Sequence, residues 1–239
     1  MELAKKKKKL GVIGGLGPAA TSYYYDSVIK HTKASCDQEH IDMFILSHAS
    51  TPDRTQAIMS QNTKELIDSL IQDIKLLEYA GVSNIAIPCN TSHYFYDVMQ
   101  SSTQVPIIHM VRESVLAAAA LKNGVKKIGI MGTDGTISSG IYDKECTALG
   151  MEAIHPSPDR QKDVMHIIYQ EIKCGKPGSE DLFQRVMDEF MEKGCDVVIL
   201  ACTELSVYRQ NHKVSEFCLD AMDVLVKESI LRSNGEYIK

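Results

Sequence analysis

Short apolar runs alternate with amphipathic stretches along the whole chain. A short apolar run rich in Ile and Val is typical of a central strand in a parallel sheet, because such a strand is buried on both faces. Amphipathic stretches with apolar residues every three or four positions predict helices that cover such a sheet. This alternation indicates an α/β protein with parallel sheets.

The pattern sets the expected order of elements. We expect strands at Lys9–Gly14, Asp42–Ser47, Asn84–Pro88, Pro106–His109, Lys127–Met131, Met151–Ile154 and Asp196–Leu200. We expect helices at Pro18–Thr32, Asn62–Ala80, a turn-rich segment after Thr91, Met110–Asn123, Ser138–Leu149, Gln161–Cys174, Gly178–Lys193 and Val214–Ser233. Pro18 suits a first helical position, and Gly81, Gly124, Gly150 and Gly194 suit helix ends.

An internal repeat predicts two related halves. The strand beginning at Leu10 resembles the strand beginning at Ile128, an offset of 128 − 10 = 118, and two strand ends carry Cys89 and Cys202, an offset of 202 − 89 = 113. We therefore expect two pseudo-symmetric α/β domains with central parallel sheets and an active site in the cleft between them. The first domain comprises residues 1–105 and 213–239, with the last helix packing back on it, and the second comprises residues 106–212.

Cys89 and Cys202 are the main candidates for chemistry. Each follows a buried-strand pattern, and ligands of parallel sheets bind at the carboxyl ends of the strands. Thiols at matching positions of two halves can face one another across a substrate. Two opposed acid/bases invert a carbon centre by removing a proton from one face and returning a proton to the other. The arrangement therefore predicts racemisation.

The glycine-rich turn after the first strand allows three interpretations. Gly15, Gly17 and Ala20 form a G-x-G-x-x-A pattern between a strand and a helix, where a dinucleotide fingerprint belongs. A nicotinamide enzyme also needs an acidic residue at the end of the next strand, and that strand ends in Ser47 and His48. The other interpretations are a turn whose backbone N–H groups, those of Gly15 and Leu16, hold a substrate carboxylate, and a purely structural turn.

Composition narrows the class of protein. The net charge of −5 gives no basic surface for nucleic acid, and no apolar run is long enough to span a membrane. The lysines at 5–9 run directly into a strand pattern without a signal-peptide apolar region, so we expect a solvated leader and a cytoplasmic protein. The seven cysteines contain no C-x-x-C pair and the eight histidines no H-x-x-x-H, so we expect no metal site.

Several segments together resemble the aspartate/glutamate racemase family, and its aspartate racemase branch in particular. They are Gly11-Val-Ile-Gly-Gly-Leu-Gly-Pro18, Thr51-Pro-Asp-Arg-Thr55, Pro88-Cys-Asn-Thr-Ser-His-Tyr-Phe-Tyr-Asp97, Met131-Gly-Thr133 and Ala201-Cys-Thr-Glu-Leu205. The resemblance covers nearly the whole chain. It implies a cofactor-independent amino-acid racemase, usually a homodimer, with one cysteine on each face of the substrate α-carbon.

The remaining site candidates serve the two ends of an acidic substrate. Donors to the α-carboxylate are expected from residues that follow strand ends, although helix capping is an alternative role for them: Asn90, Thr91, Thr133 and Thr203. Arg54 is the expected partner of the side-chain carboxylate, because its planar fork matches a carboxylate. The family pattern suggests Lys173 as a second cation, and a solvated lysine is its alternative role.

Two further residues lie close to the cysteines in sequence. Glu204 either steers the substrate ammonium or bonds to backbone at a helix start, and His93 either tunes Cys89 or makes a structural hydrogen bond, which is the favoured role. We expect racemisation of aspartate first and glutamate second. The alternatives are a dicarboxylate-binding protein with weak or no catalysis, a related isomerase or decarboxylase on the same scaffold, and the nicotinamide oxidoreductase.

Overall fold

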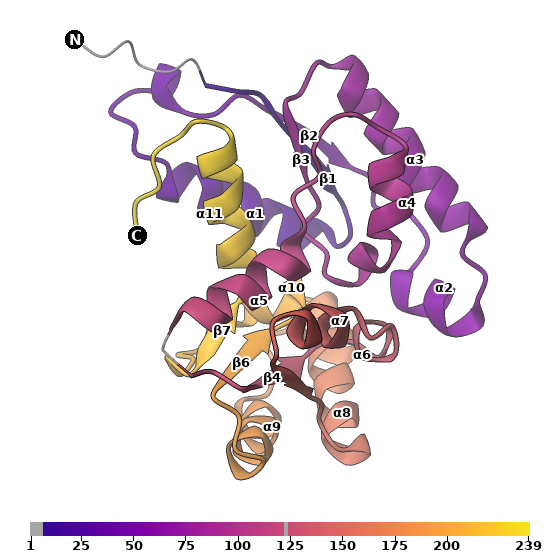
Figure 1. Ribbon diagram of the computed structural model, residues 1–239, viewed down its shortest axis with the longest axis vertical. Coiled ribbons are helices and arrows are strands. Elements are labelled where there is room, and N and C mark those ends of the chain that lie inside the picture. Colours follow the sequence, from indigo (N-terminus) through magenta and orange to yellow (C-terminus); the bar gives the residue numbers. More distant parts are fainter. Residues whose placement is uncertain (1–6, 122–123) are drawn as a thin grey trace.

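The computed structural model describes residues 7–121 and 124–239. Most of the expected leader (1–6) and the last two residues of the expected helix Met110–Asn123 lie outside the described residues. Two parallel sheets form the centres of two α/β halves that lie one above the other in Figure 1. The expected fold class is confirmed.

The first half is built on a three-stranded sheet in the order β2-β1-β3. Its strands are β1 (Leu10–Gly14), β2 (Met43–Ser47) and β3 (Asn84–Ala86). Every residue of β1 is buried, because β1 lies between the other two strands and helices cover both of its faces. This agrees with the continuous apolar run from which the strand is predicted.

The second half is built on a four-stranded sheet in the order β5-β4-β6-β7. Its strands are β4 (Lys127–Met131), β5 (Glu152–Ile154), β6 (Val197–Leu200) and β7 (Cys218–Asp220). The order β5-β4-β6 repeats the order β2-β1-β3, so β4 corresponds to β1 and β6 to β3. The repeat inferred from the sequence is therefore a repeat of topology.

The two sheets differ at the strand that follows β3 or β6. The predicted strand Pro106–His109 is reduced to a single parallel bridge between Ile107 and Ile85. Its equivalent in the second half is β7, which pairs with β6. The expectation of one helix over Val214–Ser233 is wrong at β7, because a three-residue strand is too short to show a period of two. We retain the two-domain division as a proposal in which β7 belongs to the second domain.

Helices surround both sheets. The α-helices are α1 (Pro18–His31), α2 (Arg54–Ser60), α3 (Lys64–Tyr79), α4 (Tyr96–Ser101), α5 (Met110–Leu121), α6 (Asp134–Ser138), α7 (Ile141–Ala148), α8 (Pro158–Met165), α9 (Glu180–Glu192), α10 (Thr203–Tyr208) and α11 (Ala221–Arg232). Short 3-10 turns are η1 (Asp37–Glu39), η2 (Thr91–Phe95) and η4 (Ile172–Cys174), and η3 (His166–Glu171) is a π-helical turn. Pro18 occupies the first turn of α1, as expected.

Two further helix predictions need correction. The expected helix Ser138–Leu149 begins three residues late, as α7 at Ile141, because Gly140 adopts a left-handed conformation (φ 64°). A separate short helix, α6, precedes it; Thr133 caps α6, and α6 ends at Ser138. The expected helix Gln161–Cys174 begins three residues early, at Pro158, where Ser157 provides the cap, and it changes to a π turn at His166.

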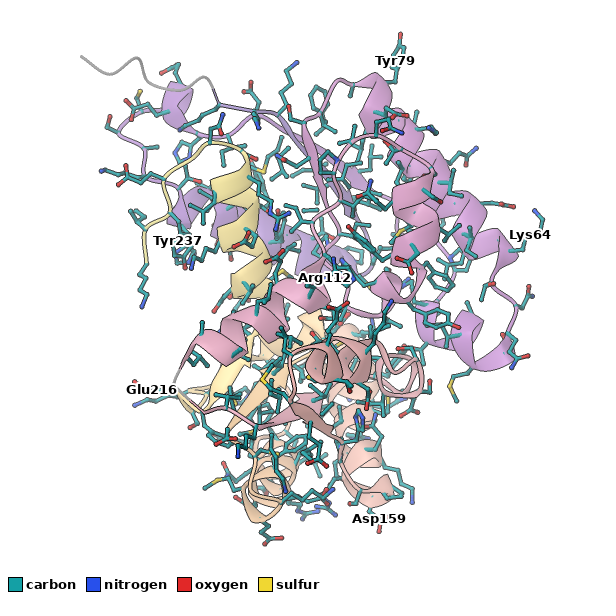
Figure 2. The ribbon with its side chains drawn as sticks, viewed as in Figure 1. Lys64, Tyr79, Arg112, Asp159, Glu216 and Tyr237 are labelled. Carbon is teal, nitrogen blue, oxygen red and sulfur yellow. The ribbon has the colours of Figure 1, made fainter. Side chains whose placement is uncertain are left out.

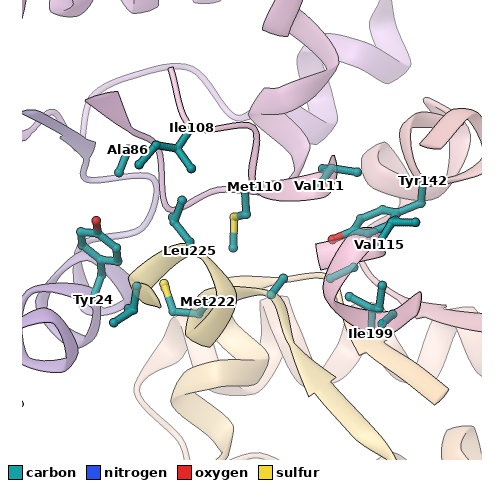
Figure 3. Close-up of a cluster of buried hydrophobic side chains, with 14 of the residues drawn as sticks. Tyr24, Ala86, Ile108, Met110, Val111, Val115, Tyr142, Ile199, Met222 and Leu225 are labelled. Carbon is teal, nitrogen blue, oxygen red and sulfur yellow. The ribbon is translucent and has the colours of Figure 1, made fainter. Parts of the chain in front are cut away.

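A shared apolar core joins the two halves. The chain crosses between them at the start of α5, and α11 packs against both α1 and α5. Figure 3 shows side chains from both halves in this cluster, with Tyr24 and Ala86 from the first half and Tyr142 and Ile199 from the second. Arg112, on α5, lies near the junction in Figure 2 and pairs with Glu145. The core therefore fixes one side of the junction between the halves.

Candidate active site

The cysteines of the two halves line the same cavity. The lining residues are Leu16, Asp53, Arg54, Thr55, Cys89, Asn90, Thr91, Thr133, Tyr169, Lys173, Cys202, Thr203 and Glu204. The cavity has a volume of about 20 Å³, which is room for roughly one water molecule. The first half supplies residues up to Thr91 and the second half supplies the rest, so the site lies between the two halves.

Cys89 lies three residues beyond the end of β3 and two residues before the η2 turn, and is buried. His93 fixes this segment: its Nδ1 bonds the Cys89 carbonyl oxygen at 2.9 Å, and its Nε2 accepts from the backbone N–H of Met110 at 3.1 Å. Burial lowers the pKa of His93, which keeps the ring neutral. His93 therefore makes structural bonds to the backbone, and the thiol is not its partner.

Cys202 lies two residues after β6, at the N-cap of α10. Its Sγ donates to Glu204 Oε2 at 3.0 Å, and Lys173 Nζ bonds Glu204 Oε1 at 2.5 Å. Burial and the negative charge of Glu204 raise the pKa of the Cys202 thiol well above its usual value. Burial opposes ionisation of Glu204, but the Lys173 ammonium and the hydrogen bonds outweigh it and hold the pKa of that carboxyl below its usual value. Cys202 is therefore the protonated member of this chain of contacts.

Arg54 is the first residue of α2, a helix that the sequence does not predict, and Asp53 caps it through the backbone N–H of Gln56 at 2.9 Å. The Arg54 guanidinium donates to the carbonyl of Leu16 at 2.8 Å and lies within hydrogen-bonding reach of the Cys89 sulfur. Burial opposes its charge, but the neighbouring Cys89 sulfur and Asp53 carboxylate outweigh this and raise the pKa of Arg54. Its Nε has no hydrogen-bond partner among the described residues, so a buried donor remains for a ligand.

Four threonine hydroxyls form a cluster across the cleft. Thr55 and Thr91 come from the first half, and Thr133 and Thr136 from the second. Thr91 Oγ1 lies 2.8 Å from Thr136 Oγ1 and 3.1 Å from Thr133 Oγ1. The backbones approach closely here: a Cβ on Gly135 would lie 2.8 Å from Thr55 Cα. Polar contacts and a glycine therefore hold the halves together at this side of the cavity.

Asn90 also faces the cavity from the first half. Its Oδ1 accepts a hydrogen bond from the Tyr142 hydroxyl at 2.6 Å. Its Nδ2 is buried and has no partner within the described part of the chain. The cavity is thus lined by a second unused donor, and unpaired buried donors are rare in folded proteins.

A second, larger cavity of about 350 Å³ adjoins the first. Asp53, Arg54, Lys173 and Glu204 line both cavities, so these four side chains form the wall between them. The glycine-rich turn and the start of α1 line the outer cavity. Gly15 lies in this outer cavity, whereas Leu16 lines the inner one.

The structure places most of the site residues expected from the sequence close together. All of the expected catalytic and substrate-binding residues except Gly15 line the inner cavity, and His93 lies outside it. Three lining residues were missed: Asp53, Thr55 and Tyr169. Asp53 and Thr55 flank Arg54, and Tyr169 lies four residues before Lys173, a spacing that places two side chains on one helical face. Lys173 is paired with Glu204 and is not a freely solvated lysine.

Nowhere in 7–121 or 124–239 do three His, Cys, Asp or Glu side chains lie together in a way that could hold a metal ion. Among the same residues, no helix has the length and apolar character needed to cross a bilayer.

Comparisons with known proteins identify the family of this chain. The family model for Asp/Glu/hydantoin racemase matches residues 13–229. The broad specificity amino-acid racemase RacX of Bacillus subtilis (strain 168) is 29% identical over 229 residues, covering 92% of this chain and 96% of that protein.

Solved structures share the fold. The aspartate racemase of Picrophilus torridus superposes with a TM-score of 0.83 at 24% identity, covering 97% of this chain and 96% of that one. An aspartate racemase homologue from Pyrococcus horikoshii OT3 gives a TM-score of 0.74 at 25% identity, covering 95% and 99%. The chain therefore belongs to the Asp/Glu/hydantoin racemase family and is an amino-acid racemase.

Proposed function

We propose that this racemase inverts aspartate first and glutamate second, without a cofactor, using Cys89 and Cys202 as the two acid/bases. The observation that carries the proposal is that thiols from equivalent strand ends of the two halves line one closed cavity. A hydantoin racemase or another isomerase on this scaffold is the alternative. The positive charges of Arg54 and Lys173 in the cavity wall favour an acidic amino acid over the substrates of these alternatives.

The unused donors support a carboxylate ligand. Asn90 Nδ2 and Arg54 Nε are buried without partners in the described chain, and Thr91 and Thr133 line the same cavity. Removal of an α-proton places negative charge on the substrate carboxylate, and preorganised donors in a dry cavity stabilise such charge strongly. We assign the α-carboxylate to Asn90, Thr91, Thr133 and Thr203, and the side-chain carboxylate to Arg54 and Lys173.

The charges around the cysteines suggest where the exchanging proton rests. The Arg54 guanidinium lies beside the Cys89 sulfur, and the Glu204 carboxylate favours a thiol at Cys202. The Cys89 thiolate removes the α-proton from the enantiomer that presents it to this side. Cys202 then gives its proton to the opposite face of the carbon and becomes the thiolate. The other enantiomer reacts by the same steps in reverse.

The size of the inner cavity requires a movement before substrate binds. A volume of about 20 Å³ cannot hold an amino acid, whereas the outer cavity of about 350 Å³ can. We infer that the substrate enters through the outer cavity and displaces the Lys173 ammonium from Glu204. The side-chain carboxylate of the substrate then replaces Glu204 as the partner of Lys173.

The family resemblance also leads us to propose a cytoplasmic homodimer. Light scattering during size-exclusion chromatography of the purified full chain measures the assembly directly. A mass of about twice 26.5 kDa is expected. A monomer that racemises aspartate would overturn the dimer proposal and leave the chemistry untouched.

The decisive experiment follows L-aspartate and L-glutamate in heavy water with purified protein and no added cofactor. Chiral chromatography and mass spectrometry should show the D enantiomer with deuterium at the α-carbon. The Cys89→Ser/Cys202→Ser double variant is the control for contaminating racemases. Because the relative from Bacillus subtilis is described as broad in specificity, other L-amino acids belong in the same panel.

The panel separates the alternatives. Inversion of a neutral amino acid in preference to aspartate would overturn the acidic-substrate proposal. Binding of aspartate without inversion or exchange would indicate a dicarboxylate-binding protein. Inversion by the double variant would overturn the two-cysteine mechanism.

A further inference from the structure

We propose that Tyr142 is a positioning residue that sets the orientation of the Asn90 amide and so points its N–H donor at the substrate carboxylate. The proposal rests on the proposed function, because it takes Asn90 to be a substrate donor. It concerns a residue that does not line the catalytic cavity and that acts through another side chain.

The contact between the two side chains is fully buried. Tyr142 is 1% exposed and Asn90 is 2% exposed. The Tyr142 hydroxyl donates to Asn90 Oδ1 at 2.6 Å. This distance is typical of an O–H···O bond, as expected where the amide oxygen faces the tyrosine. Burial raises the pKa of Tyr142, so the hydroxyl keeps its proton and remains a donor.

The tyrosine thereby determines what the amide presents to the cavity. A carboxamide has one acceptor end and one donor end. With Oδ1 held by Tyr142, the free end is Nδ2, and Nδ2 has no partner among the residues that the structure describes. A flipped amide would present its oxygen to the substrate carboxylate, and two acceptors repel. The hydroxyl of Tyr142 therefore selects the amide orientation that binds an anion.

The bond also crosses between the halves. Asn90 follows the first sheet, whereas Tyr142 lies on α7 of the second half and packs in the shared core beside α5 (Figure 3). The correct amide orientation is consequently specified only while α7 lies against the Cys89 segment. Tyr142 contributes nothing to the cavity wall, so the sequence around the cysteines gives no sign of it.

A double-mutant cycle tests the proposal. We expect Tyr142→Phe to lower kcat/KM for aspartate by about tenfold or more, because the amide loses its orientation and a hydrogen bond to a charged group is lost. Asn90→Ala should cause a loss of at least this size. In the Asn90→Ala background, Tyr142→Phe should cause no further loss, because the group that it positions is gone.

The matched control is Tyr24→Phe. Tyr24 is equally buried in the same core, and its hydroxyl donates to Ser229 at 2.6 Å, away from the site. Both phenylalanine variants should lower the melting temperature to a similar extent, whereas only Tyr142→Phe should lower kcat/KM. A purely structural role predicts equal loss in the presence and absence of Asn90.

The outcomes separate this proposal from the proposed function. If the unaltered protein racemises aspartate and Tyr142→Phe matches it in kcat/KM, the positioning role is wrong and the function stands. If the losses in the cycle are additive, the role is also wrong. If the unaltered protein inverts no acidic amino acid, the proposed substrate class is wrong, and the cycle is run with the amino acid that the protein does invert. Additive losses in that cycle would overturn the positioning role as well.

Discussion

The surroundings of the two cysteines differ although their places in the fold correspond. Cys89 follows β3 and lies beside the Arg54 guanidinium, with its backbone held by His93. Cys202 follows β6 and donates to the Glu204 carboxylate, which Lys173 neutralises. The repeat therefore delivers two thiols in equivalent positions, and residues outside the repeat give them opposite electrostatic neighbours.

This difference teaches that a symmetric reaction does not need a symmetric site. The two enantiomers have equal free energy, so kcat/KM must be the same in both directions for any variant that still racemises. The asymmetry can appear only in kcat and KM separately, or in exchange of the α-proton without inversion. The predictions below use these quantities, from the largest expected effect to the smallest.

Removing either thiol should strongly reduce racemisation but leave exchange of the α-proton of one enantiomer. We expect Cys89→Ser and Cys202→Ser each to lower the rate by about 10²–10⁴-fold, because each loses one acid/base. In heavy water, each variant should exchange the α-proton of one enantiomer only, and the two variants should act on opposite enantiomers. Cys195→Ser, a buried cysteine outside the cavity, is the control and should keep full activity. Exchange of the same enantiomer by both variants would contradict the opposed arrangement.

Changing the cation beside Cys89 should weaken substrate binding. We expect Arg54→Lys to raise KM for aspartate by about 10–100-fold, because lysine keeps the charge but cannot reproduce the guanidinium fork. Steady-state kinetics measured in both directions check this. The control is Arg112→Lys, which alters an arginine paired with Glu145 outside the cavity. An unchanged KM would remove Arg54 from the substrate site.

Changing the anion beside Cys202 should move a pH dependence. In the Cys89→Ser variant, exchange depends on the Cys202 thiolate, so it should rise with pH because burial and Glu204 raise the pKa of that thiol. Adding Glu204→Gln removes the repelling charge, and the rise should move to lower pH by about 1–3 pH units. Glu189→Gln, which alters a carboxylate bonded to Ser157, is the control. A rise that moves to higher pH would show that Glu204 does not act on Cys202 as a charge.

The smallest effect is expected at Gly135, which lies where the two halves meet, and it should slow both directions of racemisation alike. A Cβ on Gly135 would meet Thr55 Cα at 2.8 Å and Thr91 Cγ2 at 3.0 Å, which forces the two halves apart. We expect Gly135→Ala to lower the free energy of unfolding by about 1–3 kcal/mol and to lower kcat by a similar factor in both directions. Ser138→Ala, on the exposed face of the same helix, should change neither quantity. A lower kcat in only one direction of racemisation would contradict the prediction, because it would mean that Gly135 affects only one of the two cysteines.

The sequence predicts the site better than it predicts the elements that build it. Cys89 and Cys202 can be found because each ends a continuous apolar strand, and a buried parallel strand leaves that signal in the sequence. Helix α2 and strand β7 cannot be found in this way, because each is short and its residues are fixed by tertiary contacts. Arg54 is accordingly chosen correctly as a lining residue, whereas the helix that it begins is not predicted.

The missing part of the site consists of contacts between the halves. Tyr169 bonds Asp53, and Tyr142 bonds Asn90, across more than fifty positions of sequence in each case. A single sequence carries no record of such pairs, since neither tyrosine stands in a motif. The partner of Glu204 could not be predicted either, because Lys173 reaches it from the 3-10 turn η4, which follows a π-helical turn that the helical pattern does not reveal.

The near-absence of space between the cysteines has a consequence for affinity. If a ligand binds only a shape that the free protein adopts for a fraction of the time, its apparent dissociation constant is divided by that fraction. A shape populated one time in a hundred would weaken every competitive ligand by about a hundredfold. Mutations that loosen the contact of the halves, such as those at the threonine cluster, should then tighten the binding of inhibitors even as they slow turnover. A weak inhibitor of this racemase is thus no sign of poor chemical complementarity.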